Sequence, residues 1–137
     1  MFIQAETKLI GSVAKESGIP IKTIRYYEEL GLLKTTGRTE GGFRLFSADV
    51  FSRLSFIKRS QSLGLSLSEI REFLEIHDRG DLPCDQVQAK LKNKLVEVDR
   101  QIQQLQILKQ ELEGLLSSSK VPFESSAATI CPIIEHT

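Results

Sequence analysis

Residues 10–31 read Ile10-Gly11-Ser12-Val13-Ala14-Lys15-Glu16-Ser17-Gly18-Ile19-Pro20-Ile21-Lys22-Thr23-Ile24-Arg25-Tyr26-Tyr27-Glu28-Glu29-Leu30-Gly31. Apolar residues at helical spacing predict one helix over residues 10–17 and a second over residues 21–30, each followed by a glycine that suits a helix end. Only Gly18-Ile19-Pro20 separates the two helices, which is the spacing of a helix-turn-helix.

The residues that follow predict a hairpin and two more helices. Thr39-Glu40-Gly41-Gly42 lies between two extended stretches within residues 35–46, which indicates a β-hairpin or wing. Ser47 is expected to cap a third helix that runs to about Ser62. Ser66-Leu67-Ser68-Glu69 has the pattern of a capping box and predicts the start of a fourth helix.

One long helical pattern runs from Val87 to Leu116, with no proline and no glycine before Gly114. Apolar residues recur at alternating steps of four and three, with Lys109 in one of these positions. This narrow apolar stripe, which we call the seam, needs a partner helix to bury it. A helix of about 30 residues would extend roughly 45 Å, which exceeds the width of a small N-terminal domain. We therefore expect a homodimer in preference to a helix packed on its own N-terminal domain. The seam residues are Leu91, Leu95, Val98, Ile102, Leu105, Leu112 and Leu116.

Composition narrows the class of protein. Of the 137 residues, 40% are hydrophobic and 26% are charged, as in a folded globular chain. No run of about 18 apolar residues predicts a membrane span, and the N-terminal residues lack the pattern of a secretory signal. Two cysteines are too few for a disulfide framework. We therefore expect a cytoplasmic protein with no membrane partner.

The net charge of zero conceals an asymmetry along the chain. Residues 1–60 carry 10 Lys and Arg against 6 Asp and Glu, a net of +4, whereas residues 61–137 carry 8 against 12, a net of −4. A basic half favours approach to a polyanion such as DNA. On charge alone, an ordinary solvated surface explains the pattern equally well.

Polar side chains form one group on each of three predicted elements: the second helix, the wing and the third helix. On the second helix, Ile21 and Ile24 are expected to face inward, which leaves four polar side chains toward solvent. Arginine and lysine reach base edges or phosphates, and threonine and tyrosine hydroxyls reach phosphates. Three such groups on neighbouring elements favour binding to double-stranded DNA. Tyr27 and Phe46 are not counted among them, because packing between helix and wing also explains these aromatic residues. The candidate DNA contacts are Lys22, Thr23, Arg25 and Tyr26 on the second helix, Arg38 and Arg44 on the wing, and Lys58 and Arg59 on the third helix.

Five segments of the chain, taken in order, resemble the signature of MerR-type transcription regulators. The resemblance implies a winged helix-turn-helix joined to an antiparallel coiled-coil dimer. It also implies a promoter with an overlong spacer, which the effector-bound dimer bends and untwists so that RNA polymerase engages both promoter elements. One departure is Pro20, where many relatives place a Ser or Thr cap. The matching segments are residues 10–19, 23–33, 42–46, 56–58 and 63–70.

The two cysteines lie at opposite ends of the predicted long helix. Cys84 follows Pro83 at the start of the helix, where the helix dipole favours the thiolate form, and Cys131 lies in the tail before Pro132. In an antiparallel dimer, Cys84 of one chain would meet Cys131 of the partner subunit. An effector site would then belong to the dimer and occur twice.

The resemblance also extends to the segments around these cysteines. Pro83-Cys84-Asp85 and residues 129–134 are similar to the metal-site segments of the branch that senses divalent heavy metals; the copper-type branch usually has Ser in place of Cys84. The resemblance implies a divalent effector, mercury or zinc first, with cadmium, lead and cobalt as further candidates. Divalent sensors usually carry another Cys near residues 121–123, and this chain has none there. Two thiolates suffice for linear mercury, whereas four-coordinate zinc would need further ligands. The candidates for those ligands are His136, Glu135, His77 and water.

Together these patterns predict a mainly α protein. Its parts are a winged helix-turn-helix over residues 1–76, a hinge over 77–83, a dimerisation helix over 84–116 and an effector-binding tail over 117–137. The chain shows no pairing of nucleophile and base and no phosphate-binding loop, so we do not expect an enzyme. The hypothesis is a homodimeric, metal-responsive transcription activator, with repression by the effector-free dimer left open. One alternative is a redox regulator with an intersubunit Cys84–Cys131 disulfide, and another is a dimeric interaction protein with a solvated basic head.

Overall fold

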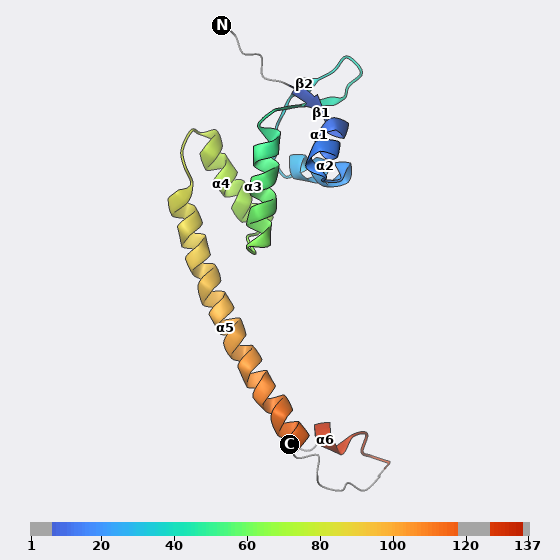
Figure 1. The fold of residues 1–137 in the computed structure, drawn as a ribbon, viewed down its shortest axis with the longest axis vertical. Coiled ribbons are helices and arrows are strands. Elements are labelled where there is room, and N and C mark those ends of the chain that lie inside the picture. The colour runs from blue at the N-terminus through green and yellow to red at the C-terminus, as the bar shows by residue number, and fades with distance from the viewer. Residues whose placement is uncertain (1–6, 118–126, 136–137) are drawn as a thin grey trace. The chain divides into compact units, whose positions relative to one another are not determined.

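The computed structural model describes residues 7–117 and 127–135. The fold is mainly helical with one small sheet, as predicted (Figure 1). The chain divides into two compact units, Met1–Lys90 and Leu91–Thr137, which we describe in turn. The elements are β1 Thr7–Leu9, α1 Ile10–Ser17, α2 Ile21–Glu29, β2 Thr35–Arg38, β3 Arg44–Ser47, α3 Val50–Ser62, α4 Leu67–Asp78, α5 Cys84–Ser117 and α6 Pro132–Glu135.

The helix-turn-helix forms where the sequence predicts it. The helix α1 ends at Gly18, which has the left-handed φ of 73° and donates its N–H to the carbonyl of Ala14 at 2.9 Å. Pro20 precedes α2, and its carbonyl accepts the N–H groups of Thr23 and Ile24. Ile24 is fully buried, but Ile21 is 39% exposed, so the expectation that both face inward is wrong for Ile21. Three residues turn a helix by about 300°, which leaves these side chains roughly 60° apart.

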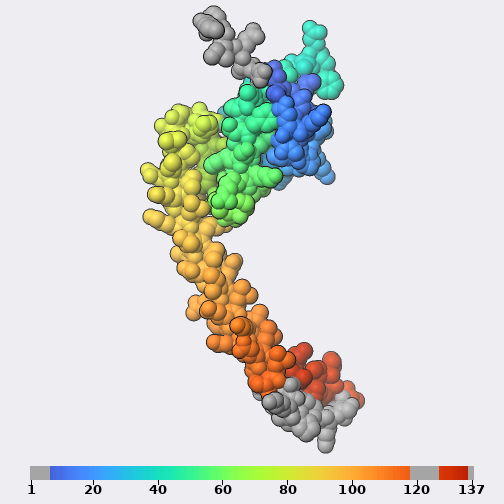
Figure 2. All heavy atoms as spheres, in the orientation of Figure 1, coloured from blue at the N-terminus to red at the C-terminus, as the bar shows by residue number. Residues whose placement is uncertain are grey.

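The wing is a three-stranded antiparallel sheet in the order β1-β3-β2. The hairpin of β2 and β3 is confirmed, and in its register Arg38 lies opposite Arg44. Sequence analysis did not identify β1, because three residues directly before a helix carry no measurable alternation. The hairpin tip stands out from the body of this unit (teal in Figures 1 and 2).

The N-terminal cap predicted for α3 is wrong, whereas the capping box predicted for α4 is confirmed. Ser47 is not the cap of α3, since it still pairs with Thr7 in the sheet and Asp49 takes the capping position. The capping box of α4 is confirmed: Ser66 Oγ accepts from the Glu69 N–H at 3.1 Å, and the Glu69 carboxylate accepts from the Ser66 N–H at 3.0 Å. The helix α4 continues to Asp78, so the connection to α5 is shorter than the predicted hinge.

A single core holds these elements together, because helices of this length are not stable alone. The four helices α1 to α4 and the strand β3 each bury at least one apolar side chain in it, and the segments after α2 and α3 add more. The core consists of Val13, Ile24, Leu32, Leu33, Phe46, Val50, Leu54, Ile57, Leu65, Ile70, Phe73 and Leu74.

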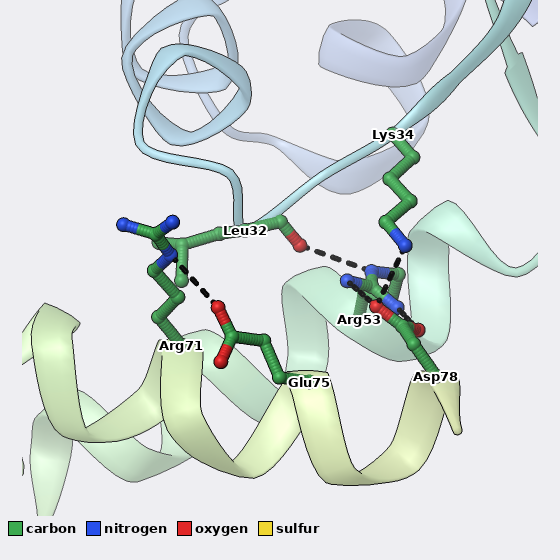
Figure 3. A network of polar contacts seen from close by, with 6 residues as sticks. All are labelled: Leu32, Lys34, Arg53, Arg71, Glu75 and Asp78. Carbon is green, nitrogen blue, oxygen red and sulfur yellow. Dashed lines mark hydrogen bonds and ion pairs between the residues drawn. The ribbon is translucent and has the colours of Figure 1, made fainter. Parts of the chain in front are cut away.

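One buried cation joins three segments of this unit (Figure 3). Arg53 on α3 is only 6% exposed; its Nε donates to the carbonyl of Leu32 at 3.0 Å. Its two Nη atoms donate to the carboxylate of Asp78 at 2.6 and 3.3 Å, and Lys34 Nζ lies 3.2 Å from the same carboxylate. The hydrogen bond from Arg53 holds the pKa of Asp78 below its ordinary value, against an opposing effect of burial, and Lys34 adds to the lowering.

The second unit contains most of α5 and the short helix α6. None of the residues of α5 is buried, and none of the described helices is long and apolar enough to cross a membrane. The sequence predicted no regular helix after residue 116, yet Pro132 begins α6 and the Glu135 carboxylate accepts from the Ile130 N–H at 3.1 Å. Four residues are too few to show helical periodicity in a sequence.

We expect Asp78→Ala to destabilise the protein, because it leaves the buried guanidinium of Arg53 without its main partner. The loss should be about 1–3 kcal/mol in the free energy of unfolding, measured by urea denaturation at fixed protein concentration. Since the pKa of Asp78 is lowered on folding, this contribution is present above the ordinary value of 3.8 and is lost as the pH falls through the folded pKa.

Asp81→Ala is the matched control, because Asp81 is exposed in the connection between α4 and α5. Equal unfolding free energies for Asp78→Ala and Asp81→Ala at neutral pH would contradict this assignment.

Candidate nucleic-acid interface and effector site

The exposed face of α2 carries the first group of candidate DNA contacts. Lys22 and Arg25 are exposed, Tyr26 is 46% exposed and Thr23 is half-buried. Burial of Ile24 fixes the rotation of α2, so these side chains lie on the side away from the core.

Tyr26 borders a hollow of about 430 Å³ that is lined from α2 and α4. Its ring meets that of Tyr27 edge to face, with centroids 6.5 Å apart. The Tyr27 hydroxyl donates to Gln61 Oε1 on α3 at 3.0 Å. Tyr27 therefore ties α2 to α3, whereas the sequence suggested packing between the helix and the wing.

The wing presents the second group, with its two arginines anchored separately. Arg38 is exposed and its Nη1 donates to the carbonyl of Gly42 at 3.1 Å. Arg44 lies opposite it in the register and is half-buried, with its Nε 3.0 Å from Glu28 Oε2 on α2. Each guanidinium keeps unused N–H donors, since arginine carries five.

Lys58 and Arg59, near the C-terminal end of α3, form the third group. Both are exposed. The Tyr27–Gln61 hydrogen bond brings α2 to this end of α3, so the first and third groups belong to neighbouring parts of one unit. Arg53 on the same helix is buried and structural, and it is not available to DNA.

Sequence analysis missed two residues at this surface. Phe43 at the wing tip is 64% exposed, and its ring lies so close to Gly41 that an added Cβ there would be 3.2 Å from it. Glu28 is the other, since it contacts Arg44. An aromatic residue in a turn is a detectable signal, whereas the Glu28 contact joins segments 16 residues apart and cannot be derived from spacing.

Both cysteines are free thiols located at helix starts. Cys84 is the exposed first residue of α5 and belongs to the first unit. Cys131 is half-buried directly before α6 in the second unit. Within residues 7–117 and 127–135 the single chain brings together no group of three or more metal-ligating side chains.

The further metal ligands considered from the sequence have different surroundings. The Glu135 carboxylate is engaged by the Ile130 N–H. His77 lies in α4, not in a hinge, and with Pro83 it lines a hollow of about 170 Å³, which places it near the start of α5. His136 and residues 121–123 lie outside the described residues.

The seam predicted along α5 is exposed in the single chain. Six of its members, from Leu95 to Leu116, are 46–70% exposed. Leu91 is half-buried. An apolar stripe of this length on one helix face is typical of an interaction surface.

Comparisons with known proteins establish the family. A model described as "MerR family regulatory protein" matches residues 9–46, and one described as "MerR, DNA binding" matches residues 51–115. The mercuric resistance operon regulatory protein of Bacillus cereus is 38% identical over 126 residues, covering 92% of this chain and 93% of that protein. The chain belongs to the MerR family.

Solved structures of MerR-family regulators share its fold. PbrR691 from Ralstonia metallidurans CH34, solved in complex with lead(II), superposes with a TM-score of 0.74 at 32% identity, covering 93% of this chain and 96% of that one. HiNmlR, a MerR family regulator lacking the sensor domain and solved bound to promoter DNA, gives a TM-score of 0.55 at 30% identity, covering 82% and 85%.

Membership of the MerR family confirms several expectations. The resemblance read from the sequence and the winged helix-turn-helix followed by a long helix are correct. The chain is a DNA-binding transcription regulator and not an enzyme, because its relatives are named as regulators and carry the same DNA-binding region.

Proposed function

We propose that this MerR-family protein is a homodimer that binds promoter DNA and changes transcription when a divalent heavy-metal ion binds. Its similarity to a mercuric resistance regulator and to a regulator solved with lead(II) supports a metal effector. Mercury or zinc is the first choice, and cadmium, lead and cobalt are further candidates. The observation that carries the proposal is the pairing of a DNA-binding region with two free thiols, one at the start of α5 and one directly before α6.

The DNA contacts are assigned to the three polar groups. Arg25 and Lys22 on α2 read base edges or hold phosphates, and Thr23 and Tyr26 add hydroxyl contacts. Arg38 and Arg44 bring the wing to the backbone, and Lys58 and Arg59 extend the contact along α3. Six of the eight side chains are exposed in one unit, and Thr23 and Arg44 are half-buried. This exposure supports the assignment, as does the similarity to a regulator solved on promoter DNA.

Dimerisation is assigned to the exposed seam of α5. A half-exposed apolar stripe costs free energy in water, at about 25 cal/mol for each Å² of apolar surface left unburied. A second copy that runs antiparallel would cover it with the same residues, as coiled-coil packing requires. The dimer would then carry two copies of the DNA-binding head, suited to a palindromic site.

The metal is assigned to thiolates from both chains, Cys84 of one and Cys131 of the partner subunit. Two thiolates suit a soft ion with linear coordination such as mercury(II). Among the described candidates for a third ligand, Glu135 is already bonded and His77 lies near the start of α5. His136 is retained as the further candidate from the tail. A bound ion would supply a cross-link between the chains and no other chemistry.

Activation is assigned to deformation of the promoter. A spacer that is too long must be bent and untwisted before RNA polymerase engages both promoter elements, and the protein must supply that deformation energy through backbone contacts. A metal that binds the deforming state of the dimer more tightly shifts the population toward it.

Arg25→Ala should weaken binding to a specific duplex by about 1–3 kcal/mol, because it removes a base-edge or phosphate contact from α2. The probe is the duplex that the unmodified protein selects from a randomised library, titrated by fluorescence anisotropy. Arg79→Ala is the matched control, since Arg79 is an exposed arginine at the end of α4. An affinity for Arg25→Ala equal to that of the control would remove α2 from the interface.

Ile102→Lys should convert the dimer to a monomer at micromolar concentration, because it places a charge in the seam. Ile107→Lys should leave the dimer intact, since Ile107 is also exposed, at 59%, but lies off the seam. Light scattering coupled to size-exclusion chromatography measures both masses. A monomeric unmodified protein, or equal masses for the two variants, would overturn the proposed interface.

Cys84→Ser and Cys131→Ser should each abolish tight mercury binding by the reduced dimer. Mixing the two variants should restore one site in each mixed dimer, because one intact Cys84 then meets one intact Cys131 of the partner subunit. A site within a single chain would show no such recovery. Competition titration with mercury, then zinc, cadmium, lead and cobalt, measures the stoichiometry.

The redox alternative makes a different prediction for the same variants. Failure of all five ions to bind, together with a covalent dimer that forms with mild oxidant and reverses with reductant, would favour it.

A further inference from the structure

A carboxylate on α2 contacts an arginine of the wing, between the first two groups of candidate DNA contacts. Glu28 on α2 has a side chain only 19% exposed, and its Oε2 lies 3.0 Å from Nε of Arg44, whose side chain is 28% exposed. The two atoms are buried and lack the alignment of a hydrogen bond, so the contact is an ion pair. It links the helix of the first polar group to the wing of the second.

The position of this ion pair leaves Arg44 able to bind DNA. A guanidinium has one Nε and two Nη atoms, and Glu28 occupies the Nε side. The four N–H donors of the two Nη atoms form the fork that matches a phosphate. Glu28 therefore restrains the arginine without using the donors that a phosphate needs.

The same ion pair offsets a repulsion within the wing. Arg38 and Arg44 lie opposite each other in the β2–β3 register. Like charges in directly opposite positions destabilise a strand pair. Arg38 is held by the Gly42 carbonyl and Arg44 by the Glu28 carboxylate, so the two guanidinium groups are anchored at different points.

We infer that Glu28 is a positioning residue that holds Arg44 ready for a phosphate of the DNA backbone. A free arginine loses rotamer freedom when it contacts a phosphate, and this loss weakens binding. An arginine already restrained by an ion pair loses less. The inference rests on the proposed role of Arg44 as a DNA contact and adds the residue that makes this contact effective.

An argument from net charge alone predicts the opposite change in DNA affinity, so one experiment distinguishes the two. Removal of any carboxylate from a DNA-facing surface lessens repulsion of the phosphates and should tighten binding. If Glu28 positions Arg44, its removal weakens specific binding even though the protein becomes more positive.

The experiment compares Glu28→Ala with Glu29→Ala in the full-length protein, at one salt concentration and without added metal. Glu29 is the neighbouring exposed carboxylate on the same helix, so both variants change the net charge equally. The probes are the duplex selected by the unmodified protein from a randomised library and a mixed-sequence duplex of equal length. Glu28→Ala should bind the selected duplex roughly twofold to tenfold more weakly, from the cost of immobilising one long side chain. Glu29→Ala should bind it as well as the unmodified protein or more tightly.

Two further variants separate positioning from a structural effect. Glu28→Ala should have no effect in a chain that already carries Arg44→Ala, because nothing remains to be positioned. Binding of Glu28→Ala to the mixed-sequence duplex should weaken by a similar factor, because a backbone phosphate carries no sequence information. A misfolded head would instead lose binding to both duplexes altogether, and would lose it in the Arg44→Ala background as well. Glu28→Gln keeps an oxygen acceptor and the side-chain length, so it should retain part of the affinity and serves if the alanine variant fails to fold.

A failure of the inference about Glu28 and a failure of the proposed DNA contact of Arg44 give different results. Tighter binding of Glu28→Ala to the selected duplex would mean that Glu28 withholds Arg44, which overturns the inference alone. Equal behaviour of Glu28→Ala and Glu29→Ala would do the same. An unchanged affinity for Arg44→Ala would remove Arg44 from the interface and overturn both the inference and the proposed DNA contact.

Discussion

The shared apolar core of the first unit is the constraint on which its functional surface depends. Helices of 8–13 residues and four-residue strands have no stability of their own, so burial must hold them in place. Ile24, Phe46 and Ile57 are each completely buried in this core and belong to α2, β3 and α3. Each lies within two residues of a proposed DNA contact. One core therefore sets the positions of all three polar groups, and a loss of packing at any point would disturb the whole proposed interface.

Burial also separates cations that look alike in the sequence. Arg53 and Lys58 lie on the same helix, yet one is buried in a bidentate pair with Asp78 and the other is exposed. Five residues turn a helix by about 500°, so the two side chains point about 140° apart. A buried guanidinium is tolerated only because Leu32 and Asp78 satisfy it, which makes Arg53 a fastening between α3, α4 and the segment after α2.

Local signals predicted much of the fold, and contacts between distant segments were beyond them. The α1–turn–α2 unit, the hairpin and the Ser66 capping box follow from glycine positions and short-range chemistry. The strand β1 and the helix α6 are too short for a periodic pattern. Ser47 does not cap α3 because it pairs with Thr7 in the sheet, and the sequence does not reveal this pairing. The candidate DNA contacts could be listed from charge and from the predicted elements, whereas the ion pair of Glu28 with Arg44 required the fold.

The exposed seam of α5 is the surface that the proposed dimer would bury. No residue of α5 is buried, although an apolar residue recurs along it at coiled-coil spacing. The two thiols belong to different units of one chain, and only five residues, 79–83, separate Asp78 from Cys84. An ion held at Cys84, as proposed, would act one short connection away from the carboxylate that fixes Arg53. Arg53 in turn donates to the carbonyl of Leu32, three residues after the end of α2. A five-residue segment and two sets of hydrogen bonds therefore connect the proposed effector site with the segment that follows α2.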